Sequence, residues 1–409
     1  MRLGLGAGSA LLVACANVEA PPGGPPDTAP PAIMRVVPES GAVVPALKDP
    51  AVIQFDEVIE ELPAGAGGPS PGAGVSGLAR QVLLSPVAGE VDVSWRRSAI
   101  RIKPKEGWKR GRVYRLELQP GIADLRRNRL DSGRVVIFST GPPLPSARVT
   151  GTALAWVEQR PLARAVIRAV LRPDTLAYLA LADSGGAFTL AGIPAGEYIV
   201  YALSDPNGNR RRDRREAYDS SLVRVDSSAS VVLWTFVHDS VGPRAIQAEA
   251  IDSLTFRLVF SQALDPRAPL DTGRVRVVAL PDSTPVPVAL VLPPKQYDSL
   301  AARERAKADS VAPAKRPAAP PAPDTGARRP DTSAMRRLLA ARPVPSDRVV
   351  VRVLQPLKPE AKYLIRVTGA TNLNGVAADG QVVLTMPKRP PPPAPRDTTK
   401  TPRDTTPPP

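Results

Sequence analysis

Proline constrains this chain more than any other residue: 50 of its 409 residues are proline, and a further 30 are glycine. Proline lacks a backbone donor and breaks helix interiors, while glycine favours tight turns. The apolar residues are mainly Val, Leu and Ala, and aromatic residues make up only 4%. Such a composition favours short strands, many turns and long linkers over helical bundles. We therefore predict an all-β fold built from tandem β-sandwich domains.

Strand-like patterns fall into three units, at residues 30–141, 146–237 and 240–387. Short runs rich in Val, Ile, Leu and Tyr, such as VYRLEL at residues 113–118, are bounded by turn residues, as expected for strands. A chain of 409 residues has room for two or three domains. We predict that each unit forms its own β-sandwich.

Two segments of the C-terminal half lack strand patterning. Residues 295–346 are rich in Ala, Pro, Lys and Arg, and we predict that this insert is disordered, with at most a helical turn or two around Ala302 or Leu338. Residues 388–409 contain Pro-Arg-Asp-Thr-Thr twice and end in prolines. We predict that they form a disordered tail.

The only cysteine of the chain, Cys15, follows a short apolar leader. Residues 1–14 carry one positive charge and then an apolar stretch of signal-peptide length, which is too short to span a bilayer. The sequence Leu-Val-Ala-Cys at residues 12–15 resembles a bacterial lipobox, which implies cleavage before Cys15 and lipidation of its thiol. Residues 15–29, rich in Pro and Gly, would then be a flexible tether. The alternative is a buried free thiol.

A lipidated Cys15 implies a lipid-anchored protein of the cell envelope. One acyl chain gives only marginal attachment, but the two or three of a lipoprotein suffice. Residue 16 is Ala rather than Asp, which by analogy with enteric sorting favours the outer membrane. Whether the folded part faces the periplasm or the surface stays open.

The first and third units contain an internal repeat that keeps its order and spacing. Residues 114–118 (YRLEL) correspond to residues 363–367 (YLIRV), and residues 123–125 (ADL) to residues 370–373 (ATNL). Further correspondences join 100–104 with 349–353, 135–140 with 382–385, and 53–55 with 258–260. The repeat predicts two sandwiches of the same kind.

Two family resemblances follow from these motifs. The first unit resembles the bacterial Ig-like domain of surface-layer proteins and envelope lipoproteins, through Pro30-Pro31, Pro38, Gly41, Ile53, Phe55-Asp56-Glu57, Tyr114, Leu116 and Phe138-Ser139-Thr140-Gly141. The third unit resembles it more weakly, with Ser261 in the place of Asp56. The middle unit resembles the carboxypeptidase-regulatory-like, prealbumin-type sandwich, through Gly151, Pro161, Ala165, Gly186, Phe188, Leu190, Gly192-Ile193-Pro194, Gly196 and Tyr198. Neither family is catalytic as a module, so the resemblances imply a chain that is not an enzyme.

The residue inventory argues against most catalytic chemistries. His238 is the only histidine, which excludes multi-histidine zinc sites and disfavours Ser-His-Asp catalysis. We expect His238 to be a polar residue at a strand end or between domains. The four tryptophans could stack on sugars, but core or edge packing is the better expectation for each.

The net charge of +15 points to an acidic partner. The basic residues are scattered and stacking aromatics are scarce, so nucleic acid is disfavoured. Anionic lipid head groups, an acidic polysaccharide or another envelope protein fit better, and solvated surface charge is the alternative.

One loop carries a metal-site pattern. Loop positions 1, 3, 5, 9 and 12 carry oxygen-bearing side chains, those of Asp205, Asn207, Asn209, Asp213 and Glu216. The main-chain carbonyl of Arg211 is available at position 7. This is the spacing by which a twelve-residue loop wraps calcium, so we predict a structural calcium site. Two departures weaken it: Arg210 stands where position 6 needs glycine, and five arginines crowd the loop. The alternative is an Asx-type turn followed by a solvated basic run.

These observations predict a non-catalytic, lipid-anchored envelope protein with a structural or binding role. The alternative is a surface adhesin or carbohydrate-binding protein, which would need an exposed aromatic patch or a patch that binds an acidic ligand.

Overall fold

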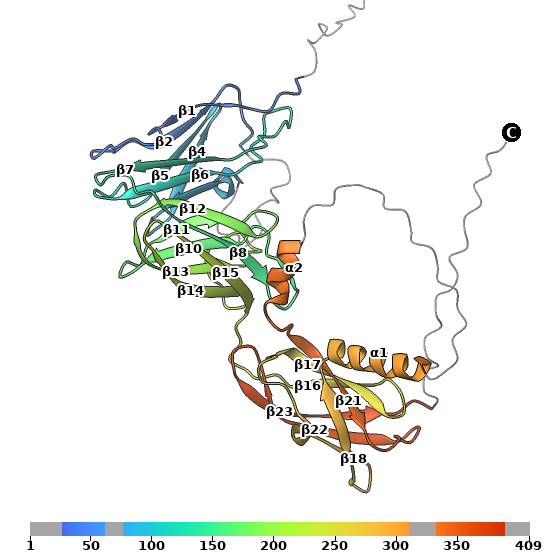
Figure 1. Cartoon of the computed structure of the whole chain (residues 1–409). Coiled ribbons are helices and arrows are strands. Elements are labelled where there is room, and N and C mark those ends of the chain that lie inside the picture. Colours follow the sequence, from blue (N-terminus) through green and yellow to red (C-terminus); the bar gives the residue numbers. More distant parts are fainter. Residues whose placement is uncertain (1–26, 62–76, 311–332, 389–409) are drawn as a thin grey trace, which may run out of the picture.

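The computed structural model describes residues 27–61, 77–310 and 333–388, arranged as three β-sandwiches in chain order (Figure 1). Cys15, the leader and most of the tether lie outside the described residues, as does the tail after residue 388. Within the described part of the chain, no helix is both long enough and apolar enough to cross a membrane. The all-β, tandem-sandwich fold predicted from proline content and strand patterning is confirmed.

The first sandwich packs a four-stranded sheet on a three-stranded one. The first sheet has the order β1-β2-β5-β4 and the second the order β3-β6-β7. The strands are β1 (Ile33–Val37), β2 (Ala51–Phe55), β3 (Val82–Ser85), β4 (Val91–Arg96), β5 (Ala99–Pro104), β6 (Val113–Leu118) and β7 (Arg134–Ser139), and a 3-10 turn η1 (Gly77–Gln81) precedes β3. Alternation explains the layering, because Ile53 and Phe55 of β2 point into the core while Gln54 between them does not.

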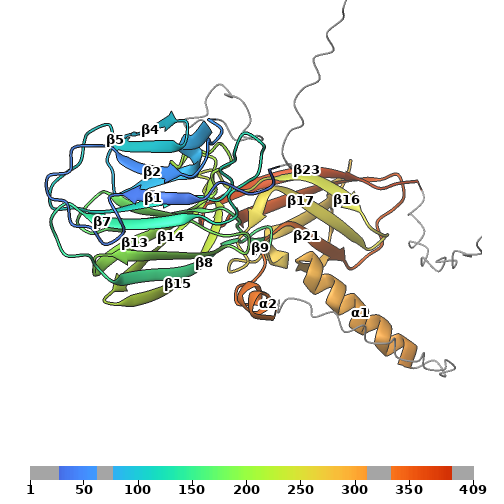
Figure 2. The ribbon, with the colours of Figure 1, turned by 90° about the horizontal axis from the view of Figure 1, so that it is seen from above.

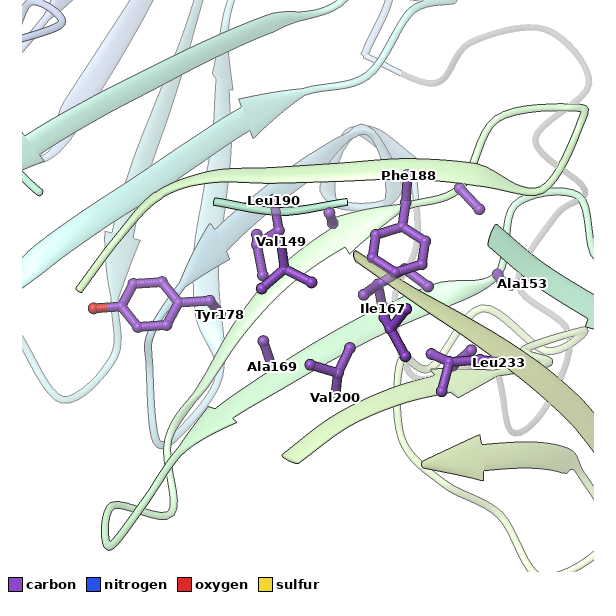
Figure 3. Packing of buried hydrophobic residues seen from close by; sticks show 14 of the residues in the cluster. Val149, Ala153, Ile167, Ala169, Tyr178, Phe188, Leu190, Val200 and Leu233 are labelled. Atoms are coloured by element: carbon purple, nitrogen blue, oxygen red, sulfur yellow. The ribbon is translucent and has the colours of Figure 1, made fainter. Parts of the chain in front are cut away.

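The middle sandwich is one sheet folded over at a corner, with the order β11-β10-β13-β14-β15-β8-β12. Its strands are β8 (Ala147–Ala155), β9 (Arg160–Pro161), β10 (Val166–Leu171), β11 (Ala177–Leu181), β12 (Ala187–Ile193), β13 (Gly196–Leu203), β14 (Ala217–Val225) and β15 (Ser228–Val237). Strands β14 and β15 pair only at Ala217 and Tyr218, so the sheet turns there. Figure 3 shows the resulting core, where Phe188 and Leu190 face Ile167 and Val200 from the opposite layer.

The third sandwich repeats the first. Its sheets have the orders β16-β17-β21-β20 and β19-β18-β22-β23. The strands are β16 (Ala245–Ala250), β17 (Thr255–Leu264), β18 (Val275–Ala279), β19 (Thr284–Val286), β20 (Val288–Leu292), β21 (Ser346–Val353), β22 (Lys362–Thr371) and β23 (Ala377–Thr385), with a 3-10 turn η2 (Thr272–Arg274) before β18. Apart from the added β19, the order is that of the first sandwich, strand for strand.

Side-chain details bear out the repeat. The Tyr114 hydroxyl accepts a hydrogen bond from the backbone N–H of Lys109, and the Tyr363 hydroxyl accepts one from Lys358, both at 2.8 Å and five residues apart. Asp124 and Asn372, the next pair of residues matched by the repeat, make equivalent hydrogen bonds. Oδ1 of each accepts the backbone N–H groups of the residues two and four positions further along the chain. The internal repeat read from the sequence is therefore a repeat of structure.

The expected disorder of residues 295–346 is wrong for helix α1 (Pro294–Ser310), which at 17 residues is longer than the turn or two allowed around Ala302. Helix α2 (Ser333–Ala340), with eight residues, has about the two turns allowed around Leu338. Residues 311–332 of this insert lie outside the described residues. Helix α1 rests on β21, where Glu304 pairs with Arg352. Helix α2 lies against the middle sandwich, beside β8 (Figures 1 and 2). Packing against a sandwich holds helices that their own sequence would barely sustain.

Candidate functional site

The first two sandwiches meet along β11, an edge strand of the middle sandwich, which lies against β3 and β6 (Figure 1). The backbone N–H of Leu179 donates to Oγ of Ser85 at 3.0 Å, and the Leu179 carbonyl accepts from Nη1 of Arg115 at 3.0 Å. Ser85 and Arg115 are both buried. Side chains of the first sandwich thus satisfy an edge backbone that would otherwise be open to pairing with another chain.

Arg115 belongs to a buried polar network within that junction. It forms an ion pair with Glu117, and Glu117 also accepts a hydrogen bond from Nε2 of Gln119. The Arg115 side chain is only 5% exposed and the Glu117 side chain 13%. A buried ion pair adds little net stability over an apolar pair, but loss of one partner strands the other charge. The network therefore makes the junction specific to one arrangement.

Arg210 is the second polar connection between the first two sandwiches. Its guanidinium donates to the carbonyls of Val82, Ala79 and Arg80, with distances of 2.6, 3.1 and 2.6 Å. Burial lowers the pKa of Arg210 to about 10, so the group is still charged at neutral pH. This arginine occupies the loop position where a calcium-binding loop normally has glycine, and its backbone has a positive φ of 58°. The residue that departs from the calcium pattern therefore makes a contact between the two domains.

The loop that carries Arg210 is closed by its own side chains. Asp205 accepts the backbone N–H groups of Asn209 and Arg210, at 3.0 and 2.9 Å. Asp213 accepts the side-chain amides of Asn207 and Asn209, at 2.7 and 2.8 Å.

Glu216 completes the loop by accepting the backbone N–H of Asp213 at 3.2 Å. Burial raises the pKa of Glu216, and the Asp213 and Asp205 carboxylates raise it further. Of the six predicted calcium ligands, five side chains therefore gather in one hydrogen-bonded loop, while the main-chain carbonyl of Arg211 makes no such contact among the described residues. The turn geometry is that of the Asx alternative, and calcium binding stays a prediction.

A hollow of about 420 Å³ opens beside this loop, at the junction. Four arginines line it, one from η1, one from β9, one from the turn before β10 and one from the loop: Arg80, Arg160, Arg164 and Arg210. Asp205 is its only carboxylate, and the rest of its wall is mainly apolar and includes Leu162 and Val166. A second hollow of about 680 Å³ shares Ala163, Arg164 and Leu181 with the first. Sequence reasoning missed this group because its arginines come from four separate segments.

The middle and third sandwiches meet through an apolar cluster. Trp156 and Trp234 of the middle sandwich are buried against Leu338 and Leu339 of α2 and against Leu373 of the third sandwich. The indole N–H of Trp156 donates to the Pro343 carbonyl at 3.1 Å. The Arg342 guanidinium lies 5.5 Å from the Trp156 ring and 5.2 Å from the Trp234 ring, within cation–π range.

The other two tryptophans are likewise engaged in packing. Trp95 donates from its indole N–H to the Ile59 carbonyl at 2.9 Å, and Trp108 packs edge-on against Tyr114 and Phe138. Packing was the expected role of all four rings, and that expectation is confirmed.

His238 directly follows β15 and is stacked between two aromatic rings, with centroids 3.8 Å from Tyr218 and 4.3 Å from Phe236. Its Nδ1 lies 3.2 Å from the Phe236 carbonyl, and burial lowers the pKa of its imidazole. The sequence predicted a strand-end polar residue here, and the structure confirms it.

An acidic group missed by the sequence reasoning brings Asp27, Glu57 and Asp124 within 4.8 Å of one another. Burial, and then the charges of Asp124, Asp27 and Asp56, raise the pKa of Glu57. Asp124 is buried and already accepts three hydrogen bonds from residues 126 and 128. These bonds give the group a structural role in shaping the turn after β6.

Comparisons with known proteins bear on the first sandwich. Residues 27–140 match the family described as bacterial Ig-like domain, which confirms that resemblance for the first unit. The comparison with curated proteins gave no match.

Some solved structures are similar at low identity. The N-terminal part of the bacterial S-layer protein SbsC shares 11% identity at a TM-score of 0.20, over 36% of this chain and 24% of that one, so this chain spans about a quarter of that structure. BcpA, the major pilin subunit of Bacillus cereus, shares 9% sequence identity at a TM-score of 0.17, over 51% of this chain and 71% of that one. The group B streptococcus pilus 2b backbone protein shares 9% sequence identity at a TM-score of 0.17, over 49% of this chain and 96% of that one.

Proposed function

We propose that this chain is a non-catalytic, lipid-anchored protein of the bacterial cell envelope, with a structural or binding role. The observation that carries the proposal is the junction of the first two sandwiches, where the buried Arg115 and the partly buried Arg210 hold the Ig-like domain against its neighbour. A rigid pair of β-sandwiches on a tether is suited to presenting a surface at a fixed distance from a membrane.

The anchor in this proposal is Cys15, with residues 15–29 as the tether. The first sandwich would then lie nearest the membrane and the third farthest along the chain. The outer membrane is the proposed location, supported by Ala16 after the cysteine. The match of residues 27–140 to the bacterial Ig-like family supports placement in the envelope.

The roles of the polar groups support a non-catalytic protein. His238 is stacked between rings, Arg115 and Arg210 bind backbone carbonyls, and Asp124 shapes a turn. General acid–base catalysis needs a group of suitable pKa free to reach a substrate, and each of these groups is committed to packing or to backbone contacts.

The proposal is tested by expressing the full chain in a bacterial host with a lipoprotein pathway, beside a Cys15→Ala variant. We expect the wild type in the membrane fraction, with a mass that shows loss of residues 1–14 and gain of acyl chains. We expect the variant to be unacylated and to leave the membrane fraction. An unacylated wild-type protein in the soluble fraction would refute lipid anchoring, and protease treatment of intact cells then decides which side the protein faces.

A second candidate, a carbohydrate-binding adhesin, is favoured by one observation. The arginine-lined hollow is a concave, positively charged site in the size range of small-ligand pockets. Because the tryptophans are engaged in packing, a glycan would be recognised here by its charge.

A further inference from the structure

The arginine-lined hollow has more positive charge than its surroundings neutralise. Both carboxylate oxygens of Asp205 already accept backbone N–H groups, and the Arg210 guanidinium is committed to three carbonyls. In the described part of the chain, the side chains of Arg160 and Arg164 make no hydrogen bond or ion pair, although both line the hollow. Two guanidinium groups are thus available to a ligand at a concave surface.

Electrostatic interactions agree with this geometry. Burial is the main cause that lowers the pKa of Arg210, and the Asp205 and Glu117 carboxylates raise it. The charges of Arg164 and Arg80 lower this pKa to a smaller extent, so these arginines are close enough to repel one another. An anion in the hollow would relieve the repulsion.

The walls of the two hollows indicate what kind of anion fits. Arginine binds carboxylates through two parallel hydrogen bonds. The apolar part of the first hollow, with Leu162 and Val166, suits the C–H face of a sugar ring. The second hollow shares Arg164 with the first and offers neutral polar groups for hydroxyls, among them Gln119 and Thr189. Its one carboxylate, Asp183, already accepts the backbone N–H groups of residues 185 and 187 through Oδ1.

We propose that the two hollows bind an acidic glycan, with the carboxylate of a uronic-acid residue held by Arg160 and Arg164 and the adjoining sugar lying in the second hollow. This inference rests on the binding role proposed above and names its ligand class. Its ligand site spans the junction, because Arg80, Gln119 and Pro120 come from the first sandwich and the other lining residues from the second.

Calorimetric titration of the full chain, with Cys15→Ser to keep it soluble, tests the proposal. The probes are trigalacturonate, neutral galactotriose and inorganic phosphate, each at about 0.15 M salt, where weak surface attraction is largely screened. We expect trigalacturonate to bind and galactotriose not to bind. The Arg160→Gln/Arg164→Gln variant is expected to bind trigalacturonate at least about tenfold more weakly, since charge-assisted hydrogen bonds are lost.

The matched control is Arg214→Gln/Arg215→Gln, which removes the same charge from exposed positions of the loop of residues 205–216 that do not line either hollow. We expect this variant to bind within about twofold of the wild type. Equal weakening by both double variants, binding of phosphate without trigalacturonate, or equal binding of galactotriose would each overturn the proposal. None of these outcomes affects the membrane-fraction test of the proposed function, so the two failures are distinguishable.

Discussion

The first and third sandwiches share one topology but attach to the middle sandwich by opposite means. The first is joined through two arginines, the buried Arg115 of the first sandwich and the partly buried Arg210 of the middle one, which donate to backbone carbonyls across the junction. The third uses Trp156, Trp234 and an added helix, α2, that together form an apolar cluster. The fold therefore does not determine how a domain docks; the residues on its edges do.

The two kinds of contact have different consequences. Burial of apolar area stabilises a junction by roughly 25 cal/mol per Å² and tolerates small shifts. Buried charges contribute little net stability, but they penalise every arrangement that leaves them without partners. We therefore expect the polar junction to fix the angle between the first two sandwiches and the apolar junction to allow more adjustment.

The largest effect is expected from Arg115→Ala. This change strands Glu117 in a buried site, so we expect a loss of about 3–5 kcal/mol in the free energy of unfolding of the first sandwich. Urea denaturation measures it. The control is Lys105→Ala, which breaks the exposed pair of Lys105 with Glu90 and should change stability negligibly. Similar losses in the two variants would show that the buried network is unimportant.

Arg210→Ala should have the next largest effect. It removes three hydrogen bonds from a charged donor to the carbonyls of Val82, Ala79 and Arg80, and we expect a loss of about 2–3 kcal/mol. Hydrogen exchange should rise in residues 77–85 of the first sandwich. The neighbouring Arg211→Ala, at an exposed position, should leave exchange unchanged; if it has the same effect, the contact is not specific to Arg210.

Leu338→Asp probes the apolar junction. A carboxylate in the tryptophan cluster should detach α2 at a cost of about 1–2 kcal/mol, because Leu338 is only partly buried. Faster hydrogen exchange in residues 334–342, with unchanged exchange in residues 77–85, is the expected pattern. Ala334→Asp adds the same charge at an exposed position of the helix and should leave α2 in place. Release by both variants would mean that the cluster does not hold the helix.

Calcium should have the smallest effect. If the loop of Asp205 and Asp213 binds it at the weak extracellular affinity of its pattern, a few millimolar calcium should stabilise the middle sandwich by about 1 kcal/mol. Thermal unfolding with calcium, with magnesium and with chelator measures this shift. Asp213→Asn should abolish it. A shift that magnesium reproduces, or that survives in the variant, would contradict calcium binding.

The sequence was sufficient to predict the features that depend on a local pattern of residues. Strand alternation and the repeat around Tyr114 and Tyr363 predict the sandwiches and their shared topology, because each strand has its own period-two pattern. The strand-end position of His238 and the packing of the tryptophans were also expected from the sequence.

What could not be predicted depends on contacts between distant segments. Helix α2 is held by Trp156, which lies far upstream, so the helix's own composition suggested disorder. The arginine-lined hollow forms only once β11 lies against β3, and no spacing along the chain relates Arg80 to Arg160 or Arg210. The loop of residues 205–216 was recognised, but its tie to the first sandwich through Arg210 required the structure.

The most direct test of the account is a spin-label distance between the first two sandwiches. Labels go on Met34→Cys in β1 and Leu222→Cys in β14, both exposed positions, in a chain with Cys15→Ser. The account predicts one narrow distance distribution that broadens in Arg210→Ala and stays narrow in Leu338→Asp. A broad distribution in the chain with Arg210 intact would contradict a rigid junction and, with it, a binding site built across the two domains.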